Sequence, residues 1–137
     1  MLALAPFFAK ERPSIMGVLN ATPDSFSDGG QFNRVSAALH RIDEMIEQGA
    51  SIIDIGGEST RPYAPAVAES EEIRRVIPIL QNAVPRFSDQ VLFSIDTTKY
   101  GVAEQALDAG ALIINDVSGL QKSPAMAGLA ASFNAAY

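Results

Sequence analysis

The sequence predicts an α/β fold with parallel strands and a polar site where those strands end. Four short runs are apolar at nearly every position, which is typical of strands covered on both faces. Each run ends in polar and small residues, and segments with helical spacing of apolar residues separate the runs. Because α/β folds bind ligands at the carboxyl ends of their strands, four loops are expected to build one site.

The elements are expected in the order βαβαβαβα. The first strand covers residues 14–20, and a loop rich in Thr, Pro, Asp, Ser and Gly follows it as far as residue 33. Apolar side chains at helical spacing then predict a helix over 35–48. The same signals place the other strands at 51–55, 91–95 and 111–115, and the other helices at 69–83, 100–109 and 123–133.

Helix boundaries carry their own signals. Gly49 and Gly110 are expected to end the first and third helices. The second helix has Glu in its first turn and Pro85 after its predicted end, and Pro78 is expected to kink it. The last helix is predicted to open with Ser123-Pro124 at its N-cap and first helical position.

Composition narrows the class of protein. The 137 residues, 47% of them hydrophobic, suffice for one domain over 1–137. The formal charge of -6, without clustered basic residues, argues against a nucleic-acid partner, and the absence of cysteine excludes disulfides and zinc-thiolate sites. The apolar run at 1–9 is too short to span a bilayer and is expected to be a strand or packing arm. We therefore expect a soluble, cytoplasmic protein without a membrane partner.

Four blocks in the sequence resemble the dihydropteroate synthase family of pterin-binding enzymes in order and spacing. They are Leu19-Asn-Ala-Thr-Pro-Asp-Ser-Phe-Ser-Asp-Gly-Gly30, Gly49-Ala-Ser-Ile-Ile-Asp-Ile-Gly-Gly-Glu-Ser-Thr-Arg-Pro62, Ser94-Ile-Asp-Thr-Thr-Lys99 and Ile113-Ile-Asn-Asp-Val-Ser-Gly119. Periodicity alone favours an open doubly wound sheet at this length. The resemblance instead implies a TIM-type (β/α)8 barrel, of which this chain would be the first four β/α units, an N-terminal half barrel.

The resemblance also implies a reaction. Members of the family condense 6-hydroxymethyl-7,8-dihydropterin diphosphate with p-aminobenzoate and release diphosphate, with Mg²⁺ at the leaving group. They are sulfonamide targets of folate biosynthesis, and the full-length proteins are homodimers. The metal-contacting oxygen would be that of Asn20, while Thr60 and Arg61 would frame the p-aminobenzoate and the leaving group. The Gly, hydroxyl and Asp residues of the loop 21–30 favour a lid that closes over the anionic ligand, and Asp24 and Asp28 would either take part in this or form Asx-turns of an ordinary surface loop.

Two polar side chains suit the pterin ring. A carboxylate at the end of an apolar strand, as at Asp96, needs a strong donor, and the 2-amino-pyrimidinone edge of a pterin offers two parallel N–H groups. Asn115 could contact neighbouring ring atoms because it carries both a donor and an acceptor. Asp54, inside the second strand, is interpreted as a structural partner of the first-strand loop, and His40 as a surface residue. No residue is assigned as a general base.

Several features depart from the family pattern. Tyr63 and Tyr100 stand where a small residue and a proline are common. The blocks of strands five to eight do not occur in this sequence, so we expect little or no activity from the chain alone. Two alternatives stay open: a pterin-binding methyltransferase module that takes methyl-tetrahydrofolate, and a non-catalytic ligand-binding half-domain.

Overall fold

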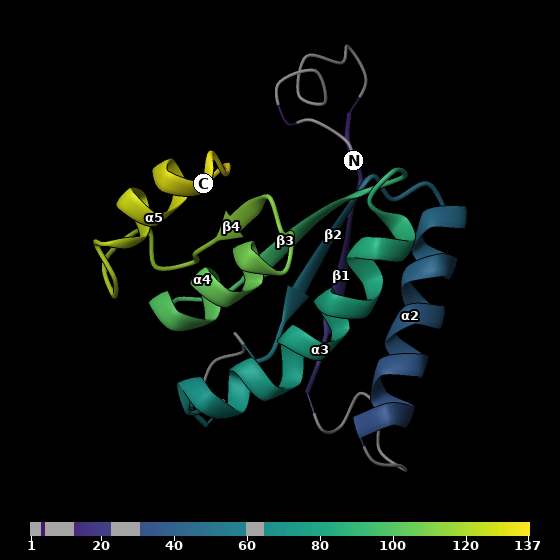
Figure 1. The fold of residues 1–137 in the computed structure, drawn as a ribbon, viewed down its shortest axis with the longest axis horizontal. Coiled ribbons are helices and arrows are strands. Elements are labelled where there is room, and N and C mark those ends of the chain that lie inside the picture. Colours follow the sequence, from purple (N-terminus) through teal and green to yellow (C-terminus); the bar gives the residue numbers. More distant parts are fainter. Residues whose placement is uncertain (1–3, 5–12, 23–30, 60–64) are drawn as a thin grey trace.

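The predicted order of strands and helices is confirmed. The computed structural model of the protein describes residues 4, 13–22, 31–59 and 65–137, with the backbone alone at 31 and 32. Figure 1 shows the elements, which are β1 (Met16–Asn20), α2 (Gln31–Glu47), β2 (Ile52–Gly56), α3 (Glu69–Phe87), β3 (Leu92–Asp96), α4 (Tyr100–Asp108), β4 (Ile113–Asn115) and α5 (Met126–Phe133).

The sheet has the strand order of a barrel rather than that of a doubly wound fold. Its four strands are parallel and lie in the order β1-β2-β3-β4, so each strand pairs with its neighbour in sequence. In a doubly wound sheet, the order of the strands along the sheet would instead reverse at a switch point. Helix α2 packs on β1 and α3, α3 packs on α4, and α4 packs on α5. The open sheet favoured by periodicity is therefore wrong, and the four β/α units of a half barrel are confirmed.

The main core lies between the sheet and its helices. Alternate strand residues point to this side, among them Leu19, Ile53, Ile55, Phe93, Ile95 and Ile114, none more than 3% exposed. They meet the apolar faces of α2, α3 and α4, and Ile42, Val76, Leu80 and Val102 are fully buried there. This packing fixes the direction of each strand and, with it, the place where each strand ends.

The opposite face of the sheet, which faces the axis in a barrel, is arranged in three rows by the strand register. The first row contains Met16, Ile52 and Leu92; the second contains Val18, Asp54, Ser94 and Ile113; the third contains Asn20, Gly56, Asp96 and Asn115. Leu4, from the apolar N-terminal run, packs against the cluster of Ile52, Leu92 and Ile113. Polar groups thus collect in the row nearest the carboxyl ends.

The edges of the sheet differ. On β1, Met16 and Val18 are 41% and 55% exposed. Beside β4, Ala136 forms a parallel bridge with Ile113, in which the Ala136 N–H donates to the Leu112 carbonyl at 2.9 Å and the Ile114 N–H donates to the Ala136 carbonyl at 2.9 Å. The chain after α5 therefore lies in the position of a next parallel strand.

Three predicted helix boundaries were wrong by three or four residues, and β1 and β4 each begin two residues later than predicted. Helix α2 begins at Gln31 instead of residue 35. Helix α3 continues to Phe87 through Pro78 and Pro85, because buried Val84 and Phe87 hold its last turn on the core and this packing outweighs the lost N–H donors. Helix α5 begins at Met126, since the residues from Ser123 form a turn in which the Met126 N–H donates to the Ser123 carbonyl at 3.1 Å.

No helix in the described ranges is both long enough and apolar enough to cross a membrane.

The glycines that end α2 and α4 provide a matched pair for mutation. Gly49 and Gly110 have φ of +98° and +102°. A Cβ at Gly49 would meet nothing within 4 Å, whereas one at Gly110 would lie 2.7 Å from Val84 Cγ1. We expect Gly49→Ala to cost about 1–2 kcal/mol through backbone strain alone. Gly110→Ala should cost about 3 kcal/mol, because overpacking is added to that strain.

Urea unfolding of the two purified variants measures both costs. Equal losses of free energy would contradict the expectation, because they would mean that Val84 moves aside at no cost.

Candidate functional site

The third row of the sheet is the framework of the candidate site. Asn20 is aligned with Gly56, Gly56 with Asp96, and Asp96 with Asn115, so the three predicted ligand-binding side chains share one face and one level. Gly56 leaves a gap in the row because it has no side chain, and a Cβ there would contact Asp96 Oδ2 at 3.4 Å. Asn20 is exposed at the end of β1. The arrangement predicted from the strand ends is present.

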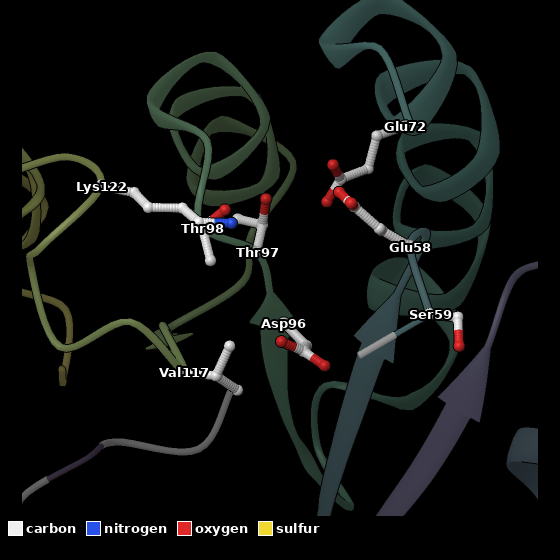
Figure 2. A pocket seen from close by; sticks show the side chains of 8 residues that line it. All are labelled: Glu58, Ser59, Glu72, Asp96, Thr97, Thr98, Val117 and Lys122. Atoms are coloured by element: carbon white, nitrogen blue, oxygen red, sulfur yellow. The ribbon is translucent and has the colours of Figure 1, made fainter. Parts of the chain in front are cut away.

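A cavity of about 220 Å³ opens beside this row, with Asp96 at its centre (Figure 2). Glu58 and Glu72 lie on one side of Asp96, and Val117 and Lys122 lie on the other. The full lining is Glu58, Ser59, Glu72, Asp96, Thr97, Thr98, Val117 and Lys122. The cavity therefore combines acidic, basic and hydroxyl groups around one carboxyl group.

Asp96 has an unusual electrostatic environment. Burial, followed in decreasing order by the neighbouring carboxylates of Asp54, Glu72, Asp116 and Glu58, raises the pKa of Asp96 to about 6. A negative carboxylate at this position lacks compensation in the described part of the chain, since no hydrogen bond to its side chain is present there. It is suited to a ligand that brings N–H donors.

Asn115 is bound by a residue that the sequence did not connect with it. The Asn115 Nδ2 group donates to Asp54 Oδ2 at 2.9 Å. Asp54 is only 3% exposed, in the middle row of the inner face. Asp54 was interpreted as a partner of the first-strand loop, most of which lies outside the described residues. Within the described part, its hydrogen bond joins it to the fourth strand.

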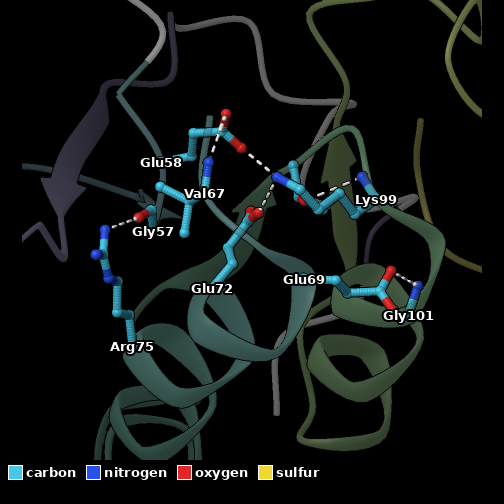
Figure 3. A network of polar contacts seen from close by, with 9 residues as sticks. Gly57, Glu58, Val67, Glu69, Glu72, Arg75, Lys99 and Gly101 are labelled. Carbon is cyan, nitrogen blue, oxygen red and sulfur yellow. Dashed lines mark hydrogen bonds and ion pairs between the residues drawn. The ribbon is translucent and has the colours of Figure 1, made fainter. Parts of the chain in front are cut away.

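A buried ionic network supports the loops behind the cavity (Figure 3). The Lys99 ammonium, after β3, donates to Glu58, after β2, and to Glu72 Oε2 on α3 at 2.5 Å. The Glu72 side chain is 1% exposed, and those of Lys99 and Glu58 are 22% and 27% exposed. Burial opposes the charge on Lys99, but the two carboxylates raise its pKa above the ordinary value. Lys99 therefore joins two loops and a helix, and its two partners, Glu58 and Glu72, line the cavity.

Two further contacts of α3 stabilise neighbouring segments (Figure 3). Arg75 Nη1 donates to the Gly57 carbonyl at 2.9 Å, which holds the end of β2. Glu69 Oε2 accepts from the Gly101 N–H at 3.2 Å, so a carboxylate lies at the N-terminus of α4. Sequence reasoning assigned the Glu residues here to the dipole of their own helix and missed these tertiary contacts.

The loop after β4 is organised by Asp116. Its carboxylate accepts the Ser118 N–H at 2.8 Å, the Leu120 N–H at 3.1 Å and the Tyr137 hydroxyl at 2.8 Å. Burial opposes ionisation, but these donors hold the pKa of Asp116 below its usual value. Leu120 has φ of +68°, so the loop adopts a left-handed conformation that this network stabilises. The result places Val117 at the cavity wall.

Other predicted residues are only partly covered by the structure. Thr60 and Arg61 lie outside the described residues, as do Asp24, Asp28 and Tyr63. His40 is on the surface as predicted, with its side chain 77% exposed beside Glu44. Tyr100 is the first residue of α4, a position that a proline would also fit.

The comparisons with known proteins define the family. The sequence profile of pterin binding enzymes matches residues 16–137, so the chain belongs to this family. The resemblance seen in the four sequence blocks is thereby confirmed. The chain is 55% identical over 124 residues to a dihydropteroate synthase from Clostridium beijerinckii, an alignment that covers 90% of this chain and 45% of the relative.

Solved structures agree in fold. The dihydropteroate synthase from Clostridium difficile in the presence of pteroic acid superposes with a TM-score of 0.85 at 48% identity, over 91% of this chain and 47% of that one. The enzyme from Xanthomonas albilineans with 4-aminobenzoic acid gives 0.82 at 45% identity, over 91% and 45%. The chain therefore spans about half the length of the proteins that it matches.

Proposed function

We propose that this chain is the pterin-binding half of a dihydropteroate synthase, a transferase that joins 6-hydroxymethyl-7,8-dihydropterin diphosphate to p-aminobenzoate. The observation that carries the proposal is the row Asn20–Gly56–Asp96–Asn115 at the strand ends of a chain in the pterin binding enzyme family. Relatives with that activity are more than half identical to it, which supports the same substrates.

Ring recognition follows from the chemistry of the row. The pterin edge carries an exocyclic amine and a ring N–H that point the same way, and a carboxylate accepts both in a charge-assisted pair. Asp96 provides such an acceptor, with few competing donors around it. Asn115 adds one amide to the same row, so the two residues would read a flat heterocycle that lies across the gap at Gly56.

A magnesium ion is a proposed cofactor, and the residues present are compatible with it. Mg²⁺ accepts one or two protein oxygens and completes its octahedron with water and substrate phosphates. In the described ranges there is no group of three His, Cys, Asp or Glu residues that could form a complete protein cage. Asn20 is an exposed residue, and its amide oxygen is a suitable single ligand. When bound, the ion would neutralise charge on the departing diphosphate.

The proposed reaction needs little acid–base catalysis. The amine nitrogen of p-aminobenzoate forms a bond to the methylene carbon of the pterin, while the carbon–oxygen bond to diphosphate breaks and diphosphate leaves with the electron pair. The amine then loses a proton to solvent. Asp96 and Asn115 would orient the ring, so most of the rate enhancement would come from positioning and from stabilisation of the leaving group. Thr60 and Arg61 stay predicted contacts of the second substrate.

Assays of the full-length protein and of residues 1–137 test the function. We expect Mg²⁺-dependent diphosphate release by the full-length protein when both substrates are present, and little or none by residues 1–137 alone. Adding the remaining half in trans should restore turnover if the halves assemble. Turnover with methyl-tetrahydrofolate instead would support the methyltransferase alternative, and binding without any turnover would support the ligand-binding half-domain.

Three finer properties belong to the same proposal. A sulfonamide should compete with p-aminobenzoate in the assay, the full-length protein should be a homodimer, and it should act in the cytoplasm with small-molecule substrates as its partners. Inhibition that increasing p-aminobenzoate does not relieve would contradict the first of these.

A further inference from the structure

Asp54 is the buried carboxylate that the proposed reaction leaves without a role. It lies on the inner face of β2, one row below Asp96 and beside Ser94 in the register. It is 3% exposed, and its Oδ2 atom accepts from Asn115 Nδ2 at 2.9 Å. Its other oxygen, Oδ1, has no hydrogen-bond partner in the described part of the chain.

This contact determines which way the amide of Asn115 faces. A nitrogen of an amide can only donate, and a carboxylate oxygen accepts, so the nitrogen of Asn115 is the atom that turns toward Asp54. The carbonyl oxygen of Asn115 must then point away from Asp54. Without such a partner, an asparagine side chain can rotate and exchange its donor and acceptor at little cost.

We propose that Asp54 is a positioning residue of the pterin site, which fixes the amide of Asn115 so that its oxygen is presented to the ligand. The inference rests on the proposed function and adds a residue to it. Asp54 makes no contact with the ligand in this scheme. It limits Asn115 to one orientation, and through Asn115 it selects heterocycles that offer an N–H at that place.

The incomplete hydrogen bonding of Asp54 favours this role over a purely structural one. Burial of a carboxylate is costly unless its oxygens are well paired. Asp54 has one bond, and the neighbouring Ser94 Oγ is also unpaired in the described residues. On the same face of the sheet, Val18, which pairs with Asp54, and Ile52, two residues before it on β2, are apolar, so an apolar side chain would suit the packing there. The presence of a carboxylate at position 54 is explained by its hydrogen bond to Asn115, which orients the Asn115 amide.

Calorimetric titration of the full-length protein with 6-hydroxymethyl-7,8-dihydropterin diphosphate tests the proposal. Asp54→Asn should weaken binding about tenfold, the effect of roughly one net hydrogen bond, because an amide at 54 accepts either orientation of Asn115. The KM for p-aminobenzoate should stay within about twofold, since that substrate does not depend on Asn115. Ser94→Ala is the matched control, because it removes a buried polar group next to Asp54 and leaves Asn115 untouched.

A double-mutant cycle separates positioning from a structural effect. In an Asn115→Ala background, Asp54→Asn should change pterin affinity less than about twofold, because the amide through which Asp54 acts on the ligand is absent. A tenfold loss that persists in that background, or an equal loss in Ser94→Ala, overturns the proposal. If Asp54→Asn does not fold, Asp54→Ser gives the same comparison, since a hydroxyl fixes neither orientation. Failure of the unmutated protein to bind the pterin would instead reject the proposed function, and the role of Asp54 with it.

Discussion

Asp96→Asn in the full-length protein is expected to weaken binding of dihydropterin diphosphate about a hundredfold. Hydrogen bonds to a charged group contribute about 1.5–3 kcal/mol each, and the amide loses the charge and offers one acceptor where the carboxylate offers two. The amide nitrogen would also face an N–H of the ring, which leaves donors opposed. Calorimetry measures the change, and Asp89→Asn, at an exposed position after α3, is the charge-matched control. Equal affinities of the two variants would show that Asp96 does not bind the pterin.

The same substitution should act on stability in the opposite direction. The pKa of Asp96 is raised from 3.8 to about 6, so the folded state holds its proton more tightly than the unfolded state does. The contribution of Asp96 to stability is therefore most favourable below pH 3.8 and is lost as the pH rises through 6. Above that pH, Asp96→Asn should melt at a higher temperature than the unmutated protein in the absence of ligand. A lower melting temperature at pH 8 would contradict this.

Ligand binding should follow the ionisation of the same group. Because the carboxylate is the proposed acceptor, affinity for the pterin should fall as the pH drops below about 6. The decrease should be absent from Asp96→Asn, which provides the control within one titration series.

Lys99→Met is expected to lower the free energy of unfolding by about 3 kcal/mol. Removal of the Lys99 ammonium leaves the fully buried Glu72 carboxylate without its cation, and removing one partner of a buried ion pair costs about 3–5 kcal/mol. Glu58→Gln should cost only about 1 kcal/mol, because Lys99 keeps Glu72. Lys122→Met is the matched control, since Lys122 is exposed, and it should change stability by less than about 0.5 kcal/mol. Urea unfolding distinguishes these values.

The pH dependence of this network has a definite sign. Burial opposes ionisation of Glu58, but the Lys99 ammonium holds the pKa of that carboxyl below its usual 4.5. Its contribution is therefore present above pH 4.5 and is lost as the pH falls through the lowered value. Equal effects of Lys99→Met and Lys122→Met at pH 7 would show that Glu72 tolerates the loss of its partner.

The sequence was sufficient for the strands and for the row of ligand-binding side chains. Three of the four strands end in a polar residue and β2 ends in Gly56, and parallel register alone brings Asn20, Asp96 and Asn115 to one level. Sequence signals for helix ends failed where tertiary packing determines the boundary of the helix. Pro85 was predicted to follow the end of α3, yet the burial of Phe87 keeps that turn helical.

Contacts between distant segments were also beyond local signals. Glu58 and Lys99 are 41 residues apart, and Asp54 and Asn115 are 61 residues apart. Whether two such side chains meet depends on their exact rotamers after the sheet has formed, which periodicity does not specify. The sequence indicated a structural partner for Asp54, but it did not identify Asn115, and it gave no partner for Lys99.

The sequential order of the strands has a consequence for how the protein folds during synthesis. The main contacts between elements join units that follow one another in the chain, and the segment at Ala136 already pairs with β4. Each newly synthesised unit can therefore dock on the one made before it, without waiting for distant sequence. Growth of this kind leaves the edge of β1 open at every stage, together with the edge of the newest strand, and these two edges would be the places most exposed to wrong partners.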